Sequence, residues 1–126
     1  MPALSAMDKN MNFDKIKYET HTGRGTTSHG LYVTGNNWVP KARFVEMWEQ
    51  VQKKLPLLDW SYPKTTKSFF EPTEWKGLKR GRRIALGRCL RYFADHQLLP
   101  IRCINPHKKG TKRYALVPSN DPHAGL

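Results

Sequence analysis

The chain has 126 residues, which is enough for one compact domain with tails but not for two independent cores. Hydrophobic residues make up 38% of it and include four Trp, five Tyr and five Phe, which excludes a chain that is disordered throughout. The formal net charge of +12 points to a polyanionic partner. No apolar run approaches the roughly 18 residues of a membrane span and no secretory signal is visible, so a cytoplasmic location without membrane contact is expected.

The positive charge is concentrated in one part of the sequence. Residues 1–75 carry ten Lys and Arg against eight Asp and Glu, a net +2, whereas residues 76–120 carry twelve against Asp95 alone, a net +11. The basic surface is therefore expected to belong to the C-terminal half.

Residues 1–29 predict a flexible N-terminal arm. Gly, Ser, Thr and His dominate residues 20–30, and only a short helical turn is expected, around Phe13, Ile16 and Tyr18. Residues 31–33 then predict a short strand, and residues 34–37 a turn.

An amphipathic helix is predicted between Pro40 and Leu55, and Pro56 ends it. Its stripe has apolar residues at i, i+4, i+7 and i+11, with Met47 beside them, which is typical of a face packed in the core. These positions are Phe44, Trp48, Val51 and Leu55.

Residues 56–72 predict an irregular connection, because they include three prolines, and their aromatic side chains are expected to dock on the core. Thr73 is expected to cap a short helix over Glu74 to Lys79, and Gly81 to permit a tight turn.

A second, longer helix is predicted from Arg82 or Arg83 to about Gln97. Leu86, Leu90 and Phe93 form its apolar stripe, flanked by Cys89 and Ala94. Gly87 lies inside this helix, where Gly costs up to about 1 kcal/mol relative to Ala, so a close helix contact is expected there.

Residues 101–105 and 111–117 predict a β-hairpin, because two β-rich runs flank a loop containing Pro and Gly. Residues 30–118 are accordingly predicted to form one nucleic-acid-binding domain, and residues 119–126 a free tail. Cys89 and Cys103 are both predicted to be small buried hydrophobic residues.

The stretch from Trp75 to Val117 resembles winged-helix domains at the level of the superfamily. The likeness lies in Leu86-Gly87-Arg88-Cys89-Leu90-Arg91 followed by Lys109-Gly110-Thr111-Lys112-Arg113-Tyr114-Ala115-Leu116. It implies an α+β fold of about three helices followed by a C-terminal β-hairpin wing. It also implies that the 82–97 helix enters a major groove while the wing follows an adjacent groove or the phosphate backbone.

Helical angles assign Arg88, Arg91 and Tyr92 to the face away from the apolar stripe. The two arginines could fork onto guanine or clamp phosphates, or could simply solvate the helix; Tyr92 could contact nucleic acid or pack between helices. Contacts to the phosphate backbone are predicted for two further groups, for which a solvated surface is the alternative. These are Lys76, Lys79, Arg80, Arg82 and Arg83 at the helix-turn-helix entry, and Lys108, Lys109, Lys112 and Arg113 in the hairpin.

Taken together, these features predict a non-enzymatic DNA-binding protein, either a transcriptional regulator or a replication accessory protein, that needs no cofactor. Duplex DNA is the expected partner, and the protein could form a homodimer. Two alternatives stay open. One is an RNA or single-stranded nucleic-acid binder, and the other is a mobile-element-encoded inhibitor or adaptor that grips an acidic protein.

Two groups of residues suggest a zinc site and a nuclease active site, but neither has the expected pattern. Cys89, His96, Cys103 and His107 lack the close ligand pairs of zinc sites. Asp59 with Glu74-Trp75-Lys76 superficially resembles a restriction-type nuclease core, but those residues belong on adjacent buried strands, and residues 56–72 are broken by prolines.

Overall fold

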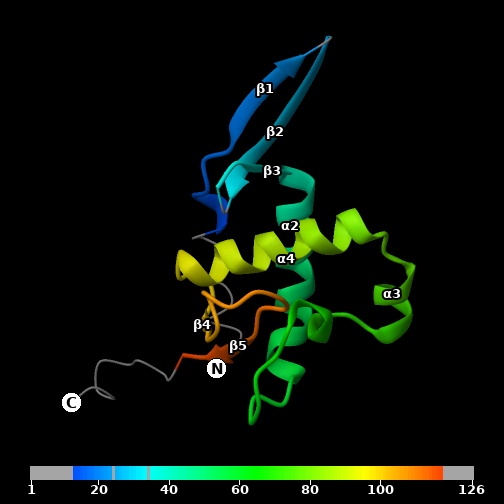
Figure 1. Cartoon of the computed structure of the whole chain (residues 1–126). Coiled ribbons are helices and arrows are strands. Elements are labelled where there is room, and N and C mark those ends of the chain that lie inside the picture. The colour runs from blue at the N-terminus through cyan, green and yellow to red at the C-terminus, as the bar shows by residue number, and fades with distance from the viewer. Residues whose placement is uncertain (1–12, 24, 34, 118–126) are drawn as a thin grey trace, which may run out of the picture.

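The computed structural model describes residues 13–23, 25–33 and 35–117, which form an α+β fold (Figure 1). Three α-helices, two 3-10 helices and two small antiparallel sheets lie wholly within them, so the predicted fold class is confirmed at this level. The helices are α2 (Lys41–Lys54), η1 (Leu55–Leu57), η2 (Thr66–Phe69), α3 (Pro72–Gly77) and α4 (Arg80–Asp95). The strands are β1 (Glu19–Gly23), β2 (Thr26–Val33), β3 (Asn37–Pro40), β4 (Ile101–Cys103) and β5 (Tyr114–Leu116).

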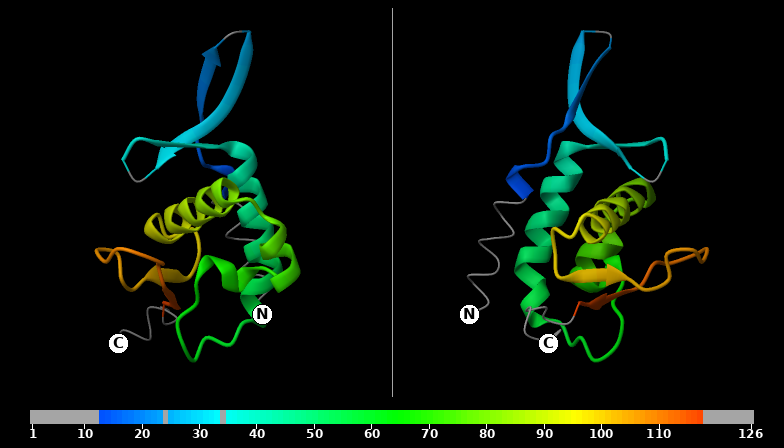
Figure 2. Two further views of the ribbon diagram at one scale, coloured as in Figure 1. Left: turned by 45° about the vertical axis from the view of Figure 1, so that its right-hand side comes forward. Right: turned by 90° about the vertical axis from the view of Figure 1, so that its left-hand side faces the viewer.

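The first sheet corrects the prediction that residues 19–29 form part of a flexible arm. β1 and β2 pair antiparallel, with Glu19 opposite Gly30, and β3 pairs with the other edge of β2. Thr20 Oγ1 lies 3.2 Å from His29 Nδ1 across the first pair. β1 and β2 project from the body as a long ribbon (Figures 1 and 2). Threonines suit a paired strand, but a strand without buried alternation carries no periodic signal in its sequence.

The segment before β1 is packed on the body. Ile16 N donates to Phe13 O at 3.1 Å, which confirms the expected helical turn. The ring of Phe13 stacks on Trp48 with centroids 4.7 Å apart, and Tyr18 meets Phe44 edge-on. These contacts hold the start of the described chain against α2.

The core lies where α4 crosses α2 (Figure 1). α2 buries the predicted stripe, with Phe44, Met47 and Val51 fully enclosed, and only Leu55 lies at its edge, beyond the helix end. α4 buries all five predicted positions: Leu86, Cys89, Leu90, Phe93 and Ala94. Both amphipathic helices are therefore confirmed.

The connection between α2 and α4 departs from the sequence prediction at two points. α3 begins at Pro72 rather than Glu74, and its cap is Glu71 rather than Thr73: Glu71 and Glu74 form a reciprocal capping box. Gly81 lies inside the first turn of α4, because the turn falls at residues 78–79. Pro72 favours the earlier start, since proline suits the first helical position.

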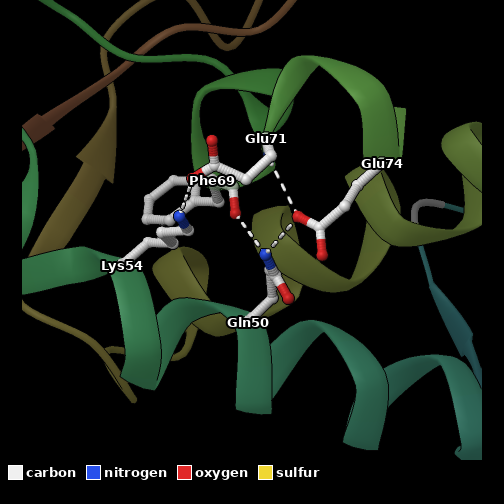
Figure 3. Close-up of polar contacts among 5 residues, drawn as sticks. All are labelled: Gln50, Lys54, Phe69, Glu71 and Glu74. Carbon is white, nitrogen blue, oxygen red and sulfur yellow. Dashed lines mark hydrogen bonds and ion pairs between the residues drawn. The ribbon is translucent and has the colours of Figure 1, made fainter. Parts of the chain in front are cut away.

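α3 and η2 are tied to α2 by a small polar network (Figure 3). The buried Gln50 amide donates to the Phe69 carbonyl at 2.7 Å and to Glu74 Oε1 at 3.4 Å. Glu74 Oε1 also accepts from the Glu71 amide at 2.9 Å, and Lys54 forms an ion pair with Glu71. Phe69 and Phe70 dock on the core as predicted, and Trp60 packs against it, whereas Tyr62 is 59% exposed and does not.

The predicted C-terminal hairpin is confirmed, with β4 and β5 antiparallel. Asn105 ties its loop together: the side chain accepts from Arg113 N at 2.7 Å and donates to Thr111 O at 3.0 Å. Lys64 pairs with Tyr114 through two 2.8 Å main-chain bonds, which joins the hairpin to the connection. Figure 2 shows the loop extending outward beside α4.

Three sequence predictions concern smaller features of the fold. Cys89 is buried as predicted, whereas Cys103 is only partly buried, because it lies at the strand end and its Sγ contacts Asn105 Oδ1 at 3.6 Å. None of the helices in the described residues is long and apolar enough to cross a membrane. Residues 1–12 and the 119–126 tail lie outside the described residues.

Replacing Phe93 with Ala should destabilise the protein by about 3–5 kcal/mol, because a fully buried ring is lost between Phe44 and Trp48. Urea denaturation followed by circular dichroism measures this. Leu57→Ala, at a side chain that is 73% exposed, should change stability by less than about 0.5 kcal/mol. Equal stability of the two variants would contradict the assigned core.

The fold should also weaken in alkali. Burial raises the pKa of Tyr18 to about 12 and also raises the pKa values of Tyr114 and Cys89. Tyr18 is held protonated in the folded state, so its contribution to stability is complete below the ordinary tyrosine pKa of about 10 and is lost as pH rises towards 12. Urea midpoints across this range should fall, and Tyr18→Phe should flatten the fall. An identical fall in Tyr18→Phe and in the exposed control Tyr62→Phe would exclude Tyr18 as a source.

Candidate nucleic-acid interface

One face of the molecule is hollowed into an open groove of about 870 Å³. α4 forms its floor, η2 with the residue before it forms one wall, and the tip of the β4–β5 loop forms another. The lining residues are Thr65, Thr66, Lys67, Trp75, Arg80, Arg83, Ile84, Gly87, Arg88, Arg91, Gly110, Thr111, Lys112 and Tyr114.

The α4 residues in the groove follow helical spacing. They stand at positions 80, 83, 84, 87, 88 and 91, so they share one face of the helix. The buried residues of α4 lie on the other side. The same helix therefore packs the core with one face and presents arginines with the other, as its sequence predicts for Arg88 and Arg91.

The groove is strongly cationic. Six of its lining residues are basic, and none of the described residues that line it carries a carboxylate: the cations are Lys67, Arg80, Arg83, Arg88, Arg91 and Lys112. Charges of one sign along a cleft in a protein focus the potential and concentrate anions there.

The arginines on the floor are held in different ways. Arg83 donates to the Trp75 carbonyl at 2.8 and 3.1 Å and lies over the Trp75 ring. Arg91 is paired with Asp95 one turn later, at 2.8 and 2.9 Å. Arg88 has no ion pair with a carboxylate of the described residues. Arg80 likewise forms no such pair and is exposed, so Arg80 and Arg88 are the floor cations available to an anion.

Several predicted contact residues lie elsewhere. Arg82 points to α2, where it forks onto Glu46 at 2.8 and 3.1 Å. Tyr92 does not face away from the core: it packs edge-on against Phe44 and stacks on His96. The buried stripe of α4 is wide enough to include this flank. Exposed positions outside the groove are occupied by Lys76, Lys79, Lys108, Lys109 and Arg113.

The groove also contains residues that sequence reasoning missed. Thr65, Thr66 and Lys67 line it because the main-chain pairing of Lys64 with Tyr114 brings this segment to the hairpin. Their only local signal is a run of hydroxyl and amino side chains between prolines. Tyr114 is 0% exposed, and its hydroxyl has no hydrogen-bond partner among the described residues.

The residues of the nuclease-like group have local structural roles. Asp59 accepts hydrogen bonds from the Ser61 hydroxyl at 2.7 Å and amide at 3.0 Å, which lower the pKa of its carboxyl group. Glu74 is engaged in the α3 cap. Within the described part of the chain, no three His, Cys, Asp or Glu side chains are grouped closely enough to hold a metal ion.

No family model matches this chain, and neither a curated protein nor a solved structure does. The winged-helix likeness thus stays a prediction. The function must therefore be inferred from the chemistry of the groove and of the basic residues near it.

Gly87→Ala should stabilise the protein by up to about 1 kcal/mol, because Ala suits a helix interior. The helix contact predicted at Gly87 is made by η2 and leaves room for a methyl group: an added Cβ would meet only Thr66 Oγ1, at an ordinary van der Waals distance of 3.5 Å. In Gly30→Ala the Cβ would fall 2.3 Å from the Val39 carbonyl oxygen, so this variant should be destabilised. Thermal melts of both variants test the contrast, and a lower melting temperature for Gly87→Ala would show that η2 packs more tightly on α4.

Proposed function

We propose that this protein is a non-enzymatic DNA-binding protein that holds the phosphate backbone in the groove on α4. The observation that carries the proposal is the set of six basic residues lining one groove without a carboxylate. Arginine and lysine on a concave surface suit phosphate, since they supply charge and several hydrogen-bond donors.

The basic residues around the groove support the same function. Exposed lysines lie close in sequence to groove residues: Lys76 and Lys79 precede Arg80, and Lys108 and Lys109 precede Gly110 in the hairpin loop. The first turn of α4 contains no acidic residue, so the partial positive charge of the helix end adds to theirs. Lys112 plays another part, because its amino group donates to the Pro106 and Lys108 carbonyls and holds the loop.

The proposal includes a winged-helix arrangement. The order α2, α3, α4 and then the β4–β5 hairpin agrees with such a domain, with α4 as the recognition helix and the hairpin loop as the wing. In this arrangement, Arg80 and Ile84 at the exposed start of α4 are the residues that would meet DNA first.

Binding to fluorescein-labelled DNA should weaken steeply with salt, because each neutralised phosphate releases counterions. Lys108→Ala combined with Lys109→Ala should reduce affinity for all sequences alike and lower the slope of log affinity against log salt by up to about 2. Fluorescence anisotropy at several salt concentrations measures both quantities.

The matched control is Lys15→Ala combined with Lys17→Ala, which removes the same charge from exposed positions before β1. It should leave the slope nearly unchanged. If both double variants lowered the slope equally, net charge alone would explain binding. If the wild-type protein bound no DNA at low salt, the proposed function would be wrong.

A further inference from the structure

Building on the proposed DNA binding, but in place of the docking of α4 in a major groove that a winged helix implies, we infer that the groove takes a single strand of nucleic acid, whose backbone lies along α4. The groove is concave around the middle of α4, with walls on η2 and on the hairpin loop.

η2 lies against the outer face of α4. A Cβ at Gly87 would lie in van der Waals contact with Thr66 Oγ1, at 3.5 Å. A helix with its side chains is about 10–12 Å wide and nearly fills a major groove of about 12 Å. A second element touching the helix face leaves no room for the middle of α4 to enter, so Gly87 to Arg91 cannot act as a probe into a duplex.

The limited solvent exposure of the floor arginines indicates that the middle of α4 is recessed. The Arg91 side chain is only 20% exposed, although it lies on the face opposite the core. Arg88 and Gly87 are also partly covered, whereas Arg80 and Ile84, near the helix start, are open. A flexible single strand can reach such a floor, but the stiff backbone of a duplex cannot follow it.

The opposite wall is preorganised. Gly110, Thr111 and Lys112 line the groove, and the loop that carries them is held by Asn105 and by the Lys112 amino group. A wall that is already ordered loses little conformational entropy when a ligand binds.

The chemistry of the floor suits unpaired nucleotides. From Arg80 to Arg91 the helix rises about 16 Å, so its cations form a row that a backbone can follow. Ile84, 40% exposed, and Trp75 add apolar surface for unstacked bases, which a duplex keeps inside.

The test compares three labelled probes on the full chain by fluorescence anisotropy at two salt concentrations. They are oligo-dT and oligo-rU of about 15 nucleotides, and a blunt DNA duplex of the same length. Oligo-dT should bind at least about tenfold more tightly than the duplex. The ratio of oligo-rU to oligo-dT identifies which polynucleotide supplies the strand.

Two helix glycines provide a matched pair of variants. Gly87→Glu places a carboxylate in the groove, whereas Gly81→Glu places one on the same helix at a residue that does not line it; no neighbour lies within 4 Å of a Cβ at Gly81. Gly87→Glu should weaken oligo-dT binding by about tenfold or more and Gly81→Glu by less than about threefold. Circular dichroism checks folding, and if Gly87→Glu is unfolded, Arg88→Gln replaces it with the exposed Arg102→Gln on β4 as its control.

The outcomes separate the two proposals. A duplex bound as tightly as oligo-dT, or oligo-dT binding that neither Gly87→Glu nor Arg88→Gln weakens more than its control, would overturn the single-strand inference and leave DNA binding in place. A lack of binding to all three probes at low salt would overturn the proposed function as well.

Discussion

The packing of Phe93 against Phe44 and Trp48 sets the rotation of α4 about its axis, and the basic groove depends on that rotation. Both ring pairs are edge-to-face, with centroids 6.1 and 5.1 Å apart. Such pairs combine apolar burial with a preferred geometry, so the helix cannot roll without losing both. With this face inward, the opposite face carries Arg80, Arg88 and Arg91 into the groove.

The walls of the groove depend on neutral contacts away from it. Gln50 holds η2 through the Phe69 carbonyl, and the main-chain bonds between Lys64 and Tyr114 hold the hairpin beside η2. A buried amide that satisfies a main-chain carbonyl is costly to break, because the carbonyl would be left unpaired. These bonds, which place η2 and the hairpin beside α4, involve none of the groove cations, and Lys112 orders only the hairpin loop itself.

Gathering six cations in one groove costs electrostatic repulsion, which neighbouring groups partly offset. Asp95 neutralises Arg91, and the Trp75 carbonyl and ring hold Arg83. Outside the groove, Glu46 pairs with Arg82 and so relieves the start of α4. These partners occupy the structurally engaged arginines and leave Lys67, Arg80 and Arg88 without a carboxylate among the described residues. A phosphate chain would complete the charge balance that the protein leaves open.

The amino-acid sequence by itself determined the two amphipathic helices, the C-terminal hairpin and the basic face of α4, because local periodicity and turn residues encode them. Only the tertiary structure decided three features that local sequence patterns do not encode. The pairing of β1 with β2 ordered a polar segment, and Phe44 drew Tyr92 towards the core. The Lys64–Tyr114 bridge brought residues 65–67 to the groove. The last two depend on contacts between residues far apart in the chain, whose energy appears only once the chain has folded. The β1–β2 pairing is local, but its strands are almost wholly exposed and so have no alternating apolar pattern to mark them.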